Sequence, residues 1–212
     1  NTDVEFKLAT KAPNGQCHKG ITRTYMPGGG AHDTGDNGDI RDAVDAAHGV
    51  WPQNKYMNIF VVKSIVGSAA YTNKPGNWYN ASGNGGSIYM GHSVMGSTGT
   101  SSMSNRHILS HEVGHWLNLS HCWGDNNSAG DPGSCSTDDS VSDTPNTIGW
   151  LGNCNLANES CGSLDNIQNI MDYAGSCRTM FTAGQSARMQ TALNSSTAQR
   201  NNLWQTSNLL AT

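Results

Sequence analysis

The segment from His111 to His121 constrains this chain more than any other part of its sequence. It reads His-Glu-Val-Gly-His-Trp-Leu-Asn-Leu-Ser-His. Residues four apart on a helix lie on one face about one turn apart, so His111 and His115 form a two-nitrogen chelate for a metal ion. Glu112 lies beside this pair, although the chain has only three glutamates. A helix whose histidines only pack or face water explains neither the glutamate nor the further histidine.

His107 and His121 compete for the third ligand position that a catalytic zinc needs beside its water. Positions four apart on a straight helix drift around the axis by about 40° per step, so His107 suits a tetrahedral site poorly. A helix that stops at Asn118 and turns back brings His121 in from another direction, and Asn readily adopts the left-handed conformation of such a stop. The predicted zinc ligands are therefore His111, His115 and His121. His107 is expected to be a partly exposed helix residue.

Glu112 is badly placed to be a fourth ligand, so its predicted role is that of general base. It would take a proton from the water at the zinc and pass it to a leaving amine. Zinc lowers the pKa of that water to about 7 and polarises a carbonyl group. Together these parts predict hydrolysis of a carbonyl compound, most simply a peptide bond.

Composition limits the binding partners and the cellular compartment that we expect for this chain. The chain has 212 residues, a formal charge of −4 and no apolar run of transmembrane length, so we expect neither nucleic acid nor a membrane as partner. Its six cysteines form no Cys-x-x-Cys pair, which argues against a thiolate zinc site or a redox motif. An even set predicts three disulfides, an oxidising compartment and secretion. Many pairings are possible, and the spacing does not choose among them.

Hydrophobic periodicity and turn residues predict the main elements. The expected strands are rich in β-branched and aromatic residues and cover Val4–Ala9, Tyr56–Val66 (a buried central strand) and Ser87–His92. The expected helices begin at Asp39, at a cap near Ser104 or Asn105, and at the Thr-x-x-Gln capping box of Thr182. Residues 122–169 have no periodicity, so disulfides and a bound cation are expected to restrain them. No interdomain linker or repeat is visible, which predicts one domain.

The segment His111–His121 resembles the metzincin signature His-Glu-x-x-His-x-x-Gly-x-x-His, which a Met-turn follows. Here Asn118 stands at the glycine position, and Asn169-Ile170-Met171-Asp172-Tyr173 resembles the Met-turn. The finer resemblance is to the pappalysin family of metzincins. It is carried by Asp143-Thr144-Pro145, Ile170-Met171-Asp172-Tyr173 with a later Cys, and Met180-Phe181-Thr182-Ala183-Gly184-Gln185 with Arg188-Met189. It covers most of the chain, from Val4–Ala9 to the last helix.

This resemblance implies an α/β (α+β) fold of metzincin type in a single catalytic domain, residues 1–212. An upper lobe (about 1–118) is expected to hold a twisted sheet and two helices, and a lower irregular lobe (about 119–212) one C-terminal helix, with the cleft between them. Met171 is expected to lie beneath the metal as a hydrophobic base. Tyr173 is expected to stabilise the oxyanion of the tetrahedral intermediate. The strand Ser87–His92 is expected to be the edge that an extended substrate joins.

The resemblance also implies a structural calcium ion in the irregular lobe, because residues 138–145 resemble the calcium region of the family. Calcium takes many oxygen ligands, including backbone carbonyls. The candidates are the Asp139 side chain and the carbonyls of Val141 and Thr144, and the alternative is an ordinary solvated acidic loop. The family pattern further suggests the disulfides Cys135–Cys161 and Cys154–Cys177, which leaves Cys17–Cys122.

These expectations describe a secreted, extracellular zinc endopeptidase that acts on protein or peptide substrates. A monomer is favoured, and the sequence leaves the oligomeric state open. An exopeptidase would need a charged group closing one end of the cleft, and none is evident. An inactive binding module structured by zinc or calcium is the alternative outside enzymes, but Glu112 and Tyr173 are both present. The loop after the Met-turn, Ala174-Gly175-Ser176, is short and uncharged. It offers no acidic wall for Arg or Lys, so specificity stays open.

Overall fold

The computed structural model describes residues 2–26, 31–33, 39–76 and 86–209. Its helices are α1 (Asp39–His48), α2 (Ile108–Trp116), α3 (Ala183–Leu193) and α4 (Thr206–Leu209), with 3-10 turns η1 (His92–Val94), η2 (Met103–Asn105), η3 (Pro132–Ser136), η4 (Gly175–Cys177) and η5 (Thr197–Asn202). Its strands are β1 (Ala31–Asp33), β2 (Ile59–Val62), β3 (Ser64–Val66), β4 (Ala70–Tyr71), β5 (Ile88–Gly91), β6 (Glu159–Ser160) and β7 (Ser163–Leu164). The predicted α/β class is confirmed.

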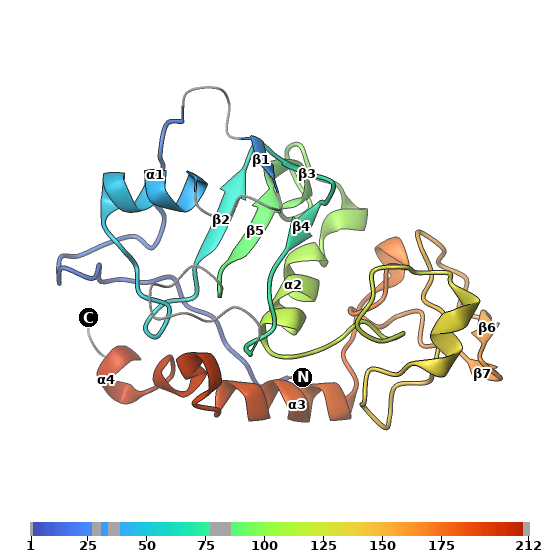
Figure 1. Cartoon of the computed structure of the whole chain (residues 1–212). Coiled ribbons are helices and arrows are strands. Elements are labelled where there is room, and N and C mark those ends of the chain that lie inside the picture. Colours follow the sequence, from blue (N-terminus) through green and yellow to red (C-terminus); the bar gives the residue numbers. More distant parts are fainter. Residues whose placement is uncertain (1, 27–30, 34–38, 77–85, 210–212) are drawn as a thin grey trace.

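Strand β5 is the centre of the sheet against which α2 packs, and the strand order of this sheet is β2-β5-β4. It pairs in parallel with β2 and antiparallel with β4. Its four residues are all buried, since helices cover both faces (Figure 1). Ile88 and Met90 join the core that contains residues of α2, whereas Tyr89 joins the core that contains Ile40 of α1. This alternation is that of a strand between two layers.

Two strand predictions were wrong in extent and place. Val4–Ala9 forms no strand, and Phe6 and Leu8 are 55% and 65% exposed, because no neighbouring strand pairs with this segment in the described part of the chain. Tyr56–Val66 divides into β2 and β3, which belong to different sheets. Strand β2 lies at an edge, so it is not the buried central strand that its composition suggested.

The substrate edge was also wrongly assigned. The segment Ser87–His92 contains β5, which pairs with β2 on one side and, at Tyr89 and Met90, with β4 on the other, so β5 is not an edge strand. The antiparallel strand β4 occupies the outer position instead. Composition did not reveal this because the two-residue β4 is too short to give a sequence pattern.

Helix α3 begins at the predicted capping box. Thr182 Oγ1 accepts a hydrogen bond from the Gln185 amide at 3.1 Å, and Gln185 Oε1 accepts one from the Thr182 amide at 3.0 Å. The irregular stretch 119–182 precedes it, and α3 then runs back beneath the sheet and α2 (Figure 1). Met189 of α3 packs in the same core as Trp116 and Leu117. The C-terminal helix thus covers the helix that carries the histidines.

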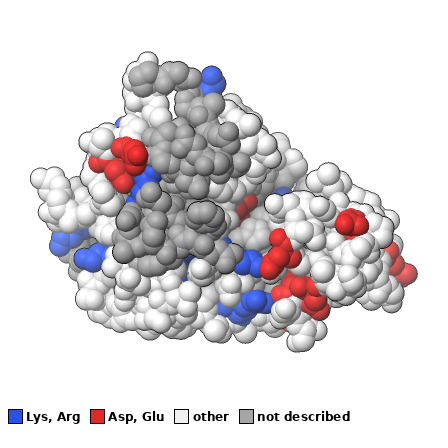
Figure 2. All heavy atoms as spheres, in the orientation of Figure 1, with Lys and Arg blue, Asp and Glu red and all other residues white. Residues whose placement is uncertain are grey.

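The surface carries few charges. Most of the face drawn in Figure 2 is uncharged, in agreement with the 13% of charged residues in the sequence. No helix within the described ranges combines the length and the hydrophobicity needed to cross a bilayer.

Removing the cap of α3 tests how far this helix supports the core. Thr182→Ala is expected to lower the free energy of unfolding by about 1 kcal/mol, because an amide of the first turn loses its acceptor. Chemical denaturation measures the change. Thr179→Ala, at an exposed threonine outside the helix, is the matched control and should stay close to the parent protein. An equal loss in both variants would contradict the capping argument.

Candidate metal centre

The structure brings His111, His115 and His121 together and leaves His107 apart. Within the described ranges, these three side chains are the one group of His, Cys, Asp or Glu whose ligand atoms all lie within 4.8 Å of one another. His115 Nε2 lies 3.0 Å from His111 Nε2 and 3.1 Å from His121 Nε2. A tetrahedral zinc with bonds of about 2.0–2.1 Å needs nitrogens about 3.3 Å apart, so the spacing fits.

Backbone carbonyls set the orientation of all three imidazoles. Each Nδ1 lies 2.8 Å from a carbonyl oxygen, and the partners of His111, His115 and His121 are Ile170, Leu119 and Asn126 respectively. Because Nδ1–H donates to the carbonyl, the lone pair of each Nε2 points to the common centre. Three facing lone pairs repel one another unless a cation lies between them. The donor set therefore fits zinc.

Burial keeps these ligands neutral. It is the largest cause that lowers the pKa of His115 to about 4 and that of His121 to about 3, and it lowers the pKa of His111 well below its ordinary value. A neutral imidazole is the form that binds a metal. His107, by contrast, precedes α2, and its Nε2 accepts a hydrogen bond from Arg106 Nε at 2.9 Å.

The turn after α2 reverses the chain and brings His121 to the other two histidines. Asn118 has φ of 73°, in the left-handed region, as predicted from its residue type. The Leu119 amide donates to the Gly114 carbonyl and the Asn118 amide to the His115 carbonyl, both at 2.9 Å. This pair of bonds is a Schellman motif, which ends a helix and reverses the chain.

Glu112 and Tyr173 border the histidines. Glu112 is 6% exposed, and burial raises its pKa to about 8. The Tyr173 hydroxyl lies 3.0 Å from His121 Nε2. Burial, and then the charge of Glu112, raise the pKa of Tyr173 to about 12, so the hydroxyl keeps its proton near neutral pH. A hydrogen-bond donor thus lies against the ligand His121, and a buried carboxyl group follows the ligand His111 in the chain.

Met171 packs against α2 in the core, and Gly114 makes room for it. Met171 is fully buried. A Cβ on Gly114 would collide with the Met171 thioether sulfur. Sequence reasoning missed this role of Gly114, although a glycine inside a short helix was a usable signal because it normally weakens the helix.

A buried amide network that the sequence did not reveal holds the turn around Met171. Asn169 and Gln185 are both 0% exposed. Asn169 Oδ1 accepts from the Met171 amide at 2.9 Å, and its Nδ2 donates to Gln185 Oε1 at 3.0 Å. Gln185 of the capping box of α3 therefore also holds the turn that contains Met171.

Two arginines hold the turn after Tyr173 by hydrogen bonds to its backbone. Arg178, which is 5% exposed, donates from Nη1 to the Asp172 carbonyl at 3.1 Å and from Nε to the Gly175 carbonyl at 3.0 Å. Arg106 Nη2 donates to the Ser176 carbonyl at 3.2 Å. The short loop predicted to lack acidic groups is thus held by two guanidinium groups.

The calcium candidates lie together in a buried turn. Asp139, Val141 and Thr144 are 2%, 7% and 8% exposed. Asp139 Oδ1 accepts from the Val141 amide and the Val141 carbonyl from the Thr144 amide, both at 3.0 Å. Asp139 Oδ2 and Thr144 Oγ1 are buried without a hydrogen-bond partner. Burial raises the pKa of Asp139 to about 7. A cation bound at this carboxylate would lower the pKa again, because it favours the charged form.

Four of the six cysteines are crosslinked. The structure joins Cys135 to Cys161 and Cys154 to Cys177. It does not form the predicted Cys17–Cys122 bridge, because Cys17 is exposed whereas Cys122 is buried in the core beside α2. A thiol inside a packed core cannot meet one on the surface without backbone movement.

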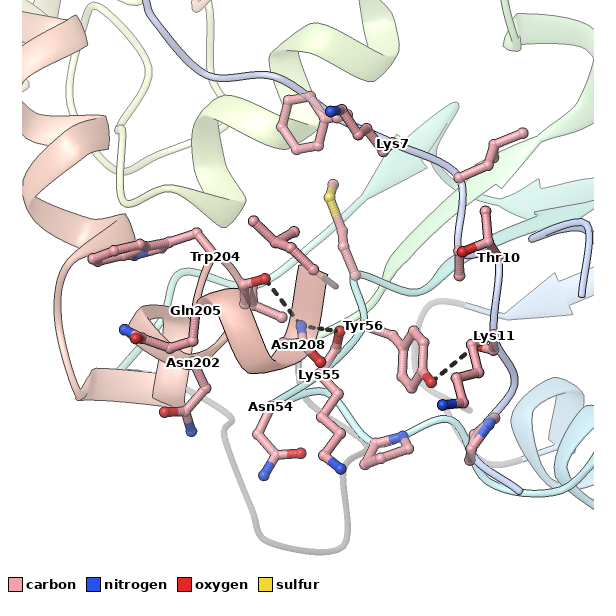
Figure 3. A pocket seen from close by; sticks show the side chains of 18 of the residues that line it. Lys7, Thr10, Lys11, Asn54, Lys55, Tyr56, Asn202, Trp204, Gln205 and Asn208 are labelled. Atoms are coloured by element: carbon pink, nitrogen blue, oxygen red, sulfur yellow. Dashed lines mark hydrogen bonds between the residues drawn. The ribbon is translucent and has the colours of Figure 1, made fainter. Parts of the chain in front are cut away.

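A hollow of about 1110 Å³ lies apart from the metal site. It lies where the N-terminal segment 4–15 faces residues 202–209 (Figure 3). Asn208 Nδ2 donates to the Lys55 carbonyl at 3.0 Å, and the Tyr56 hydroxyl donates to the Lys11 carbonyl at 3.0 Å (Figure 3). No histidine or aspartate lines it, so it offers no ligand set for a catalytic metal.

A family model for peptidase family M43, described as pregnancy-associated plasma protein-A, matches residues 39–194. The chain belongs to this family. The match spans α1 to the end of α3 and therefore includes the histidines, the turn at Met171 and the capping box. The pappalysin resemblance is thereby confirmed.

Curated relatives of this M43 chain are fungal proteins. Extracellular metalloprotease 1 of Coccidioides posadasii is 35% identical over 141 residues, which cover 63% of this chain and 48% of the relative. An extracellular metalloprotease of Sordaria macrospora is 31% identical over 156 residues, covering 66% and 49%. The chain spans about half the length of the curated relatives it matches.

Solved structures of mirolysin share the fold. Mirolysin in complex with compound 9 gives a TM-score of 0.81 at 28% identity, covering 100% of this chain and 79% of that one. Mature mirolysin of Tannerella forsythia in complex with a cleaved peptide gives 0.77 at 28% identity, covering 100% and 78%. The predicted metzincin-like fold is confirmed.

A methyl group on Gly114 tests the contact with Met171. Gly→Ala in an unobstructed helix stabilises by about 0.5–1 kcal/mol. Here Gly114→Ala is expected to destabilise by about 1–3 kcal/mol, since the new Cβ meets the thioether. Chemical denaturation gives the sign.

The control repeats Gly114→Ala in a Met171→Ala variant, which lacks the thioether that the new Cβ would meet. Gly114→Ala should become neutral or stabilising there. A destabilisation that persists in this background would show that the glycine serves another purpose.

Proposed function

We propose that this chain is the catalytic domain of a secreted zinc endopeptidase that cleaves protein or peptide substrates. The observation that carries the proposal is the convergence of three carbonyl-oriented imidazoles beside buried Glu112. Membership in peptidase family M43 and the fold shared with mirolysin support it. The peptide in one mirolysin complex supports a peptide as substrate class.

The side chains around the metal divide the chemistry of hydrolysis among them. When bound at the histidines, zinc supplies a Lewis acid that polarises the substrate carbonyl and lowers the pKa of water. Glu112 accepts a proton from the attacking water and donates it to the leaving amine. The Tyr173 hydroxyl donates to the oxygen that becomes negative, once metal binding has used the lone pair of His121 Nε2. Met171 excludes water from beneath the ligands.

Secretion and the domain organisation belong to the same proposal. The relatives named extracellular metalloproteases and the two disulfides favour an oxidising, extracellular environment. We assign residues 1–212 to one catalytic domain whose lobes meet near Asn118, where the chain reverses after α2.

We further propose a structural calcium ion at the turn of Asp139. Two buried oxygens without partners, Asp139 Oδ2 and Thr144 Oγ1, support a cation there. The carbonyls of Val141 and Thr144 would complete part of the oxygen shell that calcium prefers. Arg188, which donates to the Asp139 carbonyl at 2.7 Å, closes one side of this turn.

Glu112→Ala tests the general-base role. The variant should bind one zinc like the parent, because Glu112 is not a ligand, and its kcat on casein or a peptide should fall about a hundredfold or more. Elemental analysis and zymography measure the two quantities. Glu159→Ala, at an exposed glutamate on β6, is the control. Full activity of Glu112→Ala would exclude the base, and activity untouched by a zinc chelator would exclude the metalloprotease.

Calcium added to dialysed protein, with zinc restored, should raise Tm. Occupancy at a hundred times Kd corresponds to about 2.7 kcal/mol of stabilisation. Asp139→Asn should abolish this rise because it removes the charged ligand, whereas Asp42→Asn, at an exposed position on α1, should retain it. A calcium response that survives Asp139→Asn would place the ion elsewhere.

A further inference from the structure

Lys74 brings a positive charge into the wall of the metal site. It follows edge strand β4 by three residues, and its side chain is only 20% exposed. Its ammonium donates to Ser120 Oγ at 2.7 Å and forms an ion pair with Asp125. Ser120 directly precedes the ligand His121. Lys74 therefore ties the chain that leaves the sheet edge to the metal-binding loop.

The same ammonium lines a small cavity that opens on the histidines. The cavity has a volume of about 210 Å³, and its wall combines two metal ligands with polar side chains: Thr72, Asn73, Lys74, His115, His121, Asp125 and Asn127. Pockets for drug-sized ligands measure about 300–1000 Å³, so this one suits a single side chain. None of the described residues that line it is apolar, which makes a polar occupant the better match.

The charges around the cavity favour an anion. The three histidine ligands are neutral, so they do not cancel the charge of a bound divalent cation. Lys74 adds a positive charge, and its partner Asp125 has a side chain that is 76% exposed, where water screens it. An ammonium has three N–H donors. Its two contacts use two, and no third acceptor lies against Lys74 within the described ranges.

We propose that Lys74 is a specificity-determining residue and that this cavity receives a substrate side chain ending in a carboxylate, Asp or Glu, next to the scissile bond. The inference rests on the proposed peptidase function. The carboxylate accepts the remaining N–H of Lys74 and lies near the amides of Asn73 and Asn127. Charge-assisted hydrogen bonds of this kind are stronger than neutral ones, which gives Glu an advantage over isosteric Gln.

Cleavage profiling with a peptide set tests the assignment. Each position around a central bond carries Glu, Gln or Lys in turn. The zinc-loaded parent should favour Glu at one position by about tenfold in kcat/KM over Gln, the size expected for one charged hydrogen bond at a partly exposed site. Lys74→Met should remove this preference and bring the ratio of kcat/KM for the Glu and Gln peptides close to one. Lys74→Glu should reverse it in favour of Lys.

Two further variants keep the test decisive. Asp125→Asn removes the counter-charge and should increase the preference for Glu, which a general structural role would not do. Lys63→Met, at an exposed lysine between β2 and β3, should behave like the parent. If Glu and Gln peptides lose cleavage equally in Lys74→Met, or if Asp125→Asn lowers the preference for Glu, the proposal is overturned.

Binding separates this inference from the proposed function. Zinc-loaded Glu112→Ala and Glu112→Ala/Lys74→Met are compared by fluorescence anisotropy with the same peptides. The second variant should bind the Glu peptide about tenfold more weakly and the Gln peptide equally well. An absence of cleavage by the parent would reject the peptidase, while the anisotropy would still decide the role of Lys74. Equal binding of the Glu peptide by both variants would reject that role.

Discussion

Three hydrogen bonds from imidazoles to backbone carbonyls hold the metal site in its geometry. The carbonyls of Ile170, Leu119 and Asn126 come from three separate turns, and each fixes one ring so that Nε2 faces the common centre. The rings could rotate without these bonds, and the chelate would lose its preorganisation. The site is therefore complete only when the turn after α2, the loop behind His121 and the turn around Met171 are all folded.

The turn around Met171 links this site to helix α3. Gly114 lets Met171 approach α2, Asn169 holds the Met171 amide, and Gln185 holds Asn169 while it caps α3. Each contact is buried, so an unpaired partner would be costly. The C-terminal helix consequently contributes to the metal site although none of its residues lies among the ligands.

Two segments near the metal site differ in what positions them. Lys74 connects the chain after β4 with the loop of His121 through a charged contact, whereas Arg106 and Arg178 hold the turn after Tyr173 through carbonyl oxygens. The turn Ala174-Gly175-Ser176 has no acidic side chain, so it offers no negative wall to a substrate. Substrate preference is thus expected to depend on positive charge, in contrast to an acidic pocket for Arg or Lys.

The grouping of the three histidines and the reversal at Asn118 could be predicted from the sequence, because helical spacing and left-handed propensity act over a few neighbouring residues. The sequence also indicated the capping box at Thr182 for the same reason. Only the tertiary structure decided which strand lies at the edge, that Cys17 and Cys122 stay unbonded, and that Gly114, Asn169 and Lys74 serve the site. These features depend on contacts between residues far apart in the chain, and no local pattern records which partners the packed core will bring together.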